Sequence, residues 1–224
     1  MMNEYIFIIH SLILTCATLI GVYIGPAALT TLVSLYCLLA NIFVIKQITL
    51  FGLNATGSDA FTIGATLALN MLQEYYGKKV AWQAITINFF VLSLYTLLSY
   101  IHLWYQPNMF DSTQHHFHAI LVHTPRIVIA SVLVYFMAQA IDYYLYSFLK
   151  KYWTSRLLVV RNYISIMLSQ LFDTIAFSLF GLYGIVEHIE QIIIISYTIK
   201  VIAIIISVPW LLISRTLMSI HNKK

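Results

Sequence analysis

Apolar residues run along this chain in long blocks that short polar or basic stretches separate. The first block, Glu4–Ile24, ends at a turn formed by Gly25 and Pro26, and the second, Leu29–Ile45, ends before Lys46. Each block approaches the ~20 residues that a helix needs to cross the hydrocarbon core of a bilayer. The pattern therefore predicts membrane-spanning helices from the beginning of the chain.

Four later blocks have the same character: Val80–Tyr105, Arg126–Leu149, Asn162–Tyr183 and Gln191–Ser214. The chain is 61% hydrophobic and only 9% charged, whereas a soluble domain has roughly 25% charged residues. We predict an all-α integral membrane protein with six transmembrane helices, in which residues 1–224 form a single transporter domain. The net charge of +4 comes mainly from residues at the ends of blocks, which is typical of orientation signals rather than of nucleic-acid binding.

The segment Asp59–Tyr76 differs from the other blocks. Its unbroken apolar part is too short for an ordinary span, and Gly77 is a natural end for a helix. Asp59, Thr66, Asn70 and Glu74 approach one helical face. We expect a short re-entrant or broken helix whose polar face lines a cavity, because irregular backbone is tolerated at membrane depth only there.

Basic residues near the block ends predict the orientation. The loop Lys150–Arg161 and the C-terminus are expected in the cytoplasm, and the histidine-rich loop Gln106–Thr124 outside. A re-entrant segment would leave Lys46 and Lys78 on one side, which gives six spans and two cytoplasmic termini in a multi-pass protein of the cell inner membrane. The alternative has seven spans and an outer N-terminus, and it leaves Lys46 outside.

Asp173 is the most informative polar residue, because it lies in the middle of the block Asn162–Tyr183. A carboxylate there costs ~2.5–3.5 kcal/mol unless it faces a partner or water. Lys200 lies at a comparable depth in the next block, so the two side chains are expected to meet. The pair either belongs to a binding site or only fixes the register of two helices.

Two Gln-x-x-Asp pairs, Gln139–Asp142 and Gln170–Asp173, place an amide beside a carboxylate on one helix face. Such a pair suits a planar heterocycle, because it offers donors and acceptors side by side. Arg126 is expected at the outer end of its helix, either at an entrance or extending to lipid headgroups. Asn70 and Glu74 repeat the theme one turn apart, unless Glu74 is simply held by the nearby lysines.

No catalytic motif or cofactor motif is present, so an enzyme is not expected. His115, His116 and His118 resemble a metal tract, but their spacing fits no standard metal site. We interpret them as part of a hydrated loop; an intramembrane enzyme or metal carrier that uses them is the alternative. Cys16 and Cys37 are expected to be small core residues, and a disulfide or a metal pair formed by the two is the alternative.

In order and spacing, several stretches resemble the queuosine precursor transporter family, also called the vitamin uptake transporter family. They are Asn70–Gly77, Arg126 followed by Gln139–Asp142, Ser169–Thr174, and Tyr197–Lys200 with the later Pro209. The resemblance covers most of the chain from about Asp59 to Ser214. It implies a small, largely six-helix importer whose fold is similar to that of the membrane subunits of energy-coupling-factor vitamin importers.

The resemblance also implies the substrate: 7-cyano- or 7-aminomethyl-7-deazaguanine, or the base queuine, for tRNA queuosine modification. It assigns the family's polar residues to the positions Glu74, Arg126, Gln139, Asp142, Gln170, Asp173 and Lys200. Asn70, one turn before Glu74, completes the expected substrate-binding set, although family members commonly carry Asp there and the change removes one charge. The alternative function is a substrate-binding subunit of an ATP-driven importer, and the sequence leaves both an ATPase partner and a homodimer open.

Overall fold

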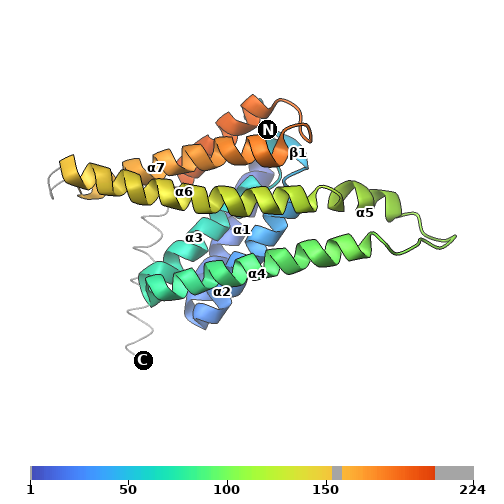
Figure 1. The fold of residues 1–224 in the computed structure, drawn as a ribbon, viewed down its shortest axis with the longest axis horizontal. Coiled ribbons are helices and arrows are strands. Elements are labelled where there is room, and N and C mark those ends of the chain that lie inside the picture. The colour runs from blue at the N-terminus through green and yellow to red at the C-terminus, as the bar shows by residue number, and fades with distance from the viewer. Residues whose placement is uncertain (1, 153–157, 205–224) are drawn as a thin grey trace.

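The computed structural model describes residues 2–152 and 158–204, which are mostly helical (Figure 1). The long helices are α1 (Met2–Ile24), α2 (Pro26–Phe43), α3 (Asp59–Tyr76), α4 (Lys78–His102), α6 (Thr124–Tyr152) and α7 (Leu158–Phe177). A short helix, α5 (Gln114–Leu121), lies between α4 and α6, and the π-helix η2 (Ser178–Leu182) extends α7. A further helix occupies residues 189–204. The strands β1 (Gln47–Leu50) and β2 (Leu53–Thr56) form an antiparallel hairpin.

Among the described residues, five segments are long and apolar enough to cross a bilayer: Met2–Ile24, Pro26–Phe43, Lys78–His102, Gln114–Asp142 and Ile164–Leu182. Large apolar side chains such as Phe90 and Leu133 are exposed on their outer faces, where lipid would cover them. The chain is therefore an all-α integral membrane protein, as predicted, with one small hairpin added. Of the last predicted span, Gln191–Ser214, the part that contains Pro209 lies outside the described residues, as does most of the loop between Lys151 and Arg161.

Two glycines allow the chain to reverse direction between closely packed helices. Gly25, with φ 122°, precedes Pro26, which opens α2 at a position where its missing N–H costs nothing. Gly77, with φ 85°, ends α3 and is followed directly by α4. Both backbone conformations are open to glycine and strained for residues that carry a Cβ atom.

The helix α3 is continuous over its 18 residues, so the predicted break is absent. It begins directly after the hairpin, near the first residues of α1, and its last residue Tyr76 donates a hydrogen bond of 3.2 Å to the carbonyl of Val22, near the last residues of α1. It thus runs alongside α1 from near the first residues of that helix to near its last. Its polar residues are tolerated because α1, α2 and α4 pack around it in place of lipid. Close packing at Gly64, against Tyr36 and Leu14, fixes its position.

The hairpin packs over one end of the bundle. Leu50 and Ala55 are fully buried against Ile195 and Ile199 of the last described helix. The backbone N–H of Asn54 donates to the side-chain carbonyl of Gln191 (2.9 Å), and the side chain of Asn3 donates to the carbonyl of Thr49 (3.0 Å). The hairpin therefore ties the beginning of α1 to the beginning of the last helix.

The bundle has two chemically distinct ends. The hairpin end holds the beginning of α1, the hairpin, Arg126 and residues 183–188, which the bonds from Arg126 to Tyr183 (2.8 Å) and from Glu187 to Gln47 (3.2 Å) hold together. The opposite end, which we call the basic end, holds the turns at Gly25 and Gly77, which follow α1 and α3, and the C-terminal end of α6. The backbone of α4 and α6 places four lysines at this basic end: Lys78, Lys79, Lys150 and Lys151.

Candidate solute-binding cavity

A cavity of about 250 Å³ lies in the middle of the bundle. Residues of α2, α3, α4, α6, α7 and the last described helix line it, so segments that are far apart in the sequence contribute. Most of the lining is apolar and partly aromatic, including Phe89, Phe136 and Phe177. The polar side chains in the lining are those of Asn41, Ser58, Thr62, Thr66, Asn88, Ser131, Tyr135, Gln170, Asp173 and Lys200. An apolar wall with a few converging polar groups is typical of a small-molecule site.

An ion pair forms one wall of this cavity. The Nζ atom of Lys200 lies 2.6 Å from Oδ2 of Asp173, and the two side chains are only 16% and 21% exposed. The predicted contact between these residues is therefore confirmed. Charge-assisted hydrogen bonds of this length are among the strongest in proteins, and removal of one partner from a buried pair typically costs ~3–5 kcal/mol.

Two amide side chains place hydrogen-bond acceptors in the lining of the same cavity. Oδ1 of Asn41 and Oδ1 of Asn88 are buried and have no hydrogen-bond partner among the residues that the structure describes. The amide nitrogen of Asn41 is held by the carbonyl of Cys37 at 2.8 Å, which fixes its orientation. Buried polar atoms are nearly always paired, so unpaired acceptors beside a cavity indicate that a solute or water completes them.

The structure brings three of the eight predicted site residues into the cavity lining: Gln170, Asp173 and Lys200. It also adds residues that the sequence left out of the site, chiefly Asn41, Asn88 and Tyr135. In the sequence, Asn88 and Tyr135 are polar residues within apolar blocks, and this pattern could have identified them as candidate cavity residues.

Two other predicted residues are engaged elsewhere. Arg126 donates from Nε to the carbonyl of Phe180 (2.9 Å) and from Nη2 to that of Tyr183 (2.8 Å), at the hairpin end. The hydroxyl of Ser165 on α7 contacts both the carboxylate and the backbone carbonyl of Asp142 on α6. Both contacts join α6 to α7 and its extension, and neither Arg126 nor Asp142 lines the cavity.

The remaining predicted residues lie away from the cavity lining or outside the description. Asn70 and Glu74 lie one turn apart in the second half of α3, towards the basic end, and neither lines the cavity. Gln139 belongs to α6, but its side chain is outside the described part of the structure.

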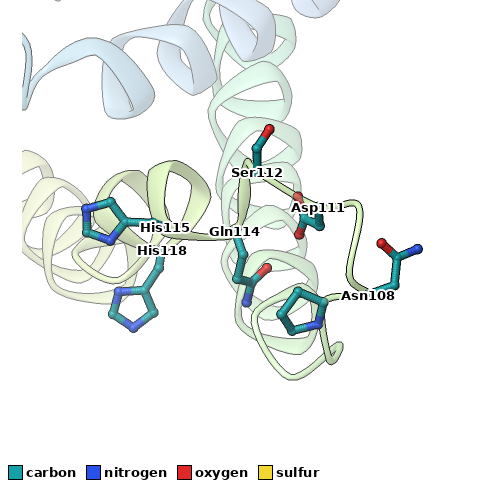
Figure 2. A pocket seen from close by; sticks show the side chains of 7 residues that line it. Asn108, Asp111, Ser112, Gln114, His115 and His118 are labelled. Carbon is teal, nitrogen blue, oxygen red and sulfur yellow. The ribbon is translucent and has the colours of Figure 1, made fainter.

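A second, open hollow lies in the loop between α4 and α6 (Figure 2). His115 and His118 project from α5 on one side of it, and Asn108 and Asp111 lie on the connecting loop. Asp111 accepts hydrogen bonds of 2.7 Å from both the backbone N–H and the hydroxyl of Thr113, which lower the pKa of this carboxyl. Within the described residues, no three His, Cys, Asp or Glu side chains are placed to hold a metal ion. The hollow is a surface feature and is more open than the central cavity.

Comparisons with known proteins agree with this architecture. The family model described as "Putative vitamin uptake transporter" matches residues 56–214. This chain belongs to the vitamin uptake transporter family. A relative from Bacillus subtilis (strain 168), the "Probable queuosine precursor transporter", is 33% identical over 174 residues, which cover 76% of each chain. No solved structure matches this family member.

The family match and the cavity overlap only in part. Residues 56–214 include α3, α4, α6 and α7 and every predicted site residue, whereas α2, which supplies Asn41 and Cys37 to the lining, precedes the match. The wall that this transporter-family protein builds from α2 is therefore the part that the family model does not describe.

Proposed function

We propose that this protein imports a 7-deazaguanine precursor of queuosine, and that the base binds in the central cavity. The observation that carries the proposal is the buried pair of Asp173 and Lys200 in the cavity wall of a chain of this family. The relative from Bacillus subtilis supports the choice of substrate by its name.

The chemistry of the cavity suits such a base. The guanine-like edge of a 7-deazaguanine presents an N–H and an amino group, which a carboxylate accepts, and a ring carbonyl, which an ammonium group can donate to. Asp173 and Lys200 supply this complementary pair, and Gln170 lies one turn before Asp173 on α7. Phe89, Phe136 and other aromatic side chains of the lining can stack on the ring.

The cavity is small for a solute site. Its volume of about 250 Å³ lies below the ~300–1,000 Å³ usual for drug-sized ligands. A compact bicyclic base fits this range better than a nucleoside or a larger vitamin. Among the three deazaguanines, the size favours the 7-cyano and 7-aminomethyl bases over queuine, which carries an additional ring.

We also propose an orientation in the cytoplasmic membrane that differs from the six-span expectation. If α3 crosses completely, as its course along α1 and α2 suggests, there are seven crossings when the apolar run Gln191–Ser214 is counted. The basic end then faces the cytoplasm, and the N-terminus and the hairpin lie outside. Lys46 is the exception to the rule in this arrangement, because it lies near the hairpin and therefore outside the cytoplasm.

The test is uptake of labelled 7-aminomethyl-7-deazaguanine by cells that can neither make nor import it. We expect uptake with the wild-type protein and a loss of ~10- to 100-fold in Asp173→Asn and Lys200→Met at equal expression, because each loses a charged hydrogen bond worth ~1.5–3 kcal/mol.

A double variant, Asp173→Asn with Lys200→Met, separates binding from folding. Replacing a whole buried pair is often neutral for stability, so the double variant should fold and still not transport. Recovery of uptake in the double variant would show that the pair is only a structural clamp. Absence of uptake by the wild type would overturn the proposed function.

A further inference from the structure

Asp59 is a buried carboxylate that the proposed base site does not use. It is the first residue of α3 and follows the hairpin closely in the chain, and only 6% of its surface is exposed. Its Oδ2 atom has no hydrogen-bond partner among the described residues. The preceding residue, Ser58, lines the central cavity, so the carboxylate lies between the hairpin end and the solute site. A buried ion with an unsatisfied oxygen is costly unless something binds it.

The positive charge that acts on Asp59 is that of Lys200. The hydroxyl groups of Ser196, one turn before Lys200, and of Thr56 on β2 also interact with the carboxyl group. Lys200 is itself bonded to Asp173 at 2.6 Å. One ammonium group therefore serves two carboxylates from different helices.

Within the described part of the chain, the other elements packed around α3 bring no second fixed cation to Asp59, and α4 carries its lysines, Lys78 and Lys79, at the opposite end of the bundle. α1 presents His10, whose ring lies edge-on to Phe61 with centroids 4.6 Å apart. α2 presents Cys37 and the phenol of Tyr36, which donates to a backbone carbonyl of α1 at 3.1 Å. Lys46, before the hairpin, is exposed.

The charges of this group do not balance. Two carboxylates and one ammonium leave a net charge of −1 inside the bundle, and a single proton on Asp59 brings the sum to zero. A metal cation is a poorer match, because the nearby ammonium repels it. We propose that Asp59 binds the proton that drives import, so that base and proton enter together; this inference rests on the proposed function.

The coupling follows from competition for Lys200. A base that engages Asp173 and Lys200 together draws the ammonium away from Asp59. The carboxylate then loses its cation and takes up a proton from the hairpin end, which becomes a carboxylic acid hydrogen. Linkage requires the reverse as well, so protonation of Asp59 tightens base binding.

The experiment uses the full chain in proteoliposomes with labelled 7-cyano-7-deazaguanine, which has no basic amine of its own, and a pH-sensitive dye inside. Exchange of labelled for unlabelled base first tests transport without any gradient. With the wild type, we expect added base to acidify the lumen, and an acidic exterior to raise accumulation by up to about tenfold per pH unit for one proton per base. A sodium gradient should have no effect.

Asp59→Asn imitates the neutral carboxyl group. It should keep exchange, lose the response to the pH gradient, and bind base with an affinity that no longer rises as the pH falls. Asp59→Glu should retain the response. Asp111→Asn, which alters an exposed carboxylate in the outer loop, is the matched control and should behave as the wild type.

The outcomes separate the two proposals. Absence of exchange by the wild type overturns the proposed function and this inference together. Exchange without proton entry, or accumulation driven by sodium, overturns the inference and leaves the function standing. Absence of a wild-type proton signal overturns the inference even if Asp59→Asn does not fold, and a retained gradient response in a folded Asp59→Asn protein also overturns it.

Discussion

An unpaired polar side chain in the cavity wall can lower the stability of the empty protein and at the same time raise its affinity for a solute. Asn88 shows this clearly, because its Oδ1 atom is buried and unpaired among the described residues. An unpaired acceptor destabilises the empty protein by its desolvation cost, ~1–3 kcal/mol, and the same atom gains a hydrogen bond when a solute arrives. Stability and affinity should therefore move apart when this amide is removed.

The substitution Asn88→Leu tests this separation. We expect the concentration of base at half-maximal uptake to rise about tenfold, which corresponds to ~1.4 kcal/mol, while the melting temperature of the purified protein stays equal or rises. Uptake kinetics and thermal unfolding in detergent measure the two effects. Gln83→Leu is the control, because Gln83 is an exposed amide on the same helix that does not line the cavity. A lower melting temperature with unchanged uptake kinetics would show that Asn88 is only structural.

At the scale of elements, Arg126 joins α6 to the extension of α7. It donates two hydrogen bonds, to the carbonyls of Phe180 and Tyr183, within and directly after the π-helix η2. A planar guanidinium group reaches both acceptors at once, and an ammonium group does not. The sequence placed this residue correctly near one end of its helix, but its partners depend on how the two helices pack.

We expect Arg126→Lys to lower the free energy of unfolding by ~1–3 kcal/mol, because one carbonyl loses its donor. Hydrogen exchange of the backbone N–H groups after Tyr183 should accelerate, while the base affinity of the folded protein stays unchanged. Thermal unfolding and hydrogen exchange monitored by mass spectrometry measure the first two effects. A large loss of affinity in a protein of normal stability would instead return Arg126 to the binding site, as the sequence and the family resemblance suggest.

Sequence patterns located elements well where lipid faces them. The predicted block Glu4–Ile24 corresponds to α1 (Met2–Ile24), and counting residues from a shared turn placed Asp173 and Lys200 at matching depth. At α3 the predicted break is absent, because a helix packed on three others can stay continuous without being apolar all round. It also missed the hairpin, whose turn at Phe51 and Gly52 has positive φ values without the usual Asn-Gly signal.

For the candidate site, the sequence predicted how deep each residue lies along its helix but not which residues of different helices are in contact. Depth follows from the rise of 1.5 Å per residue. It is enough to predict a contact between two residues on adjacent antiparallel helices. Which residues of neighbouring helices are in contact depends on the rotation of each helix about its own axis. The packing contacts of the whole bundle determine this rotation. For this reason Asp142 was placed in the site but binds Ser165, while Asn41 was left out and lines the cavity.

For the whole molecule, the distribution of basic residues along the bundle decides which end faces the cytoplasm. Lys46 and Arg126 lie at the hairpin end, and Arg126 is held by backbone carbonyls. The basic end has four lysines; in the sequence, Arg156 follows α6, and Arg161 lies near the start of α7. Because basic residues are retained on the cytoplasmic side, the hairpin and the N-terminus should be outside.

Cysteine labelling tests this orientation in intact cells, in a background where Cys16 and Cys37 are replaced by alanine. Thr49→Cys on the hairpin should react with a membrane-impermeant maleimide from outside, whereas Lys79→Cys, beyond the other end of α3, should react only after the membrane is permeabilised. Both positions are exposed, so accessibility depends on the side of the membrane rather than on burial. Asn108→Cys in the outer loop serves as the outside reference. Labelling of both test positions from the same side would restore the re-entrant α3 and the six-span topology, and Asp59 would then lack the access from outside that proton-driven import requires.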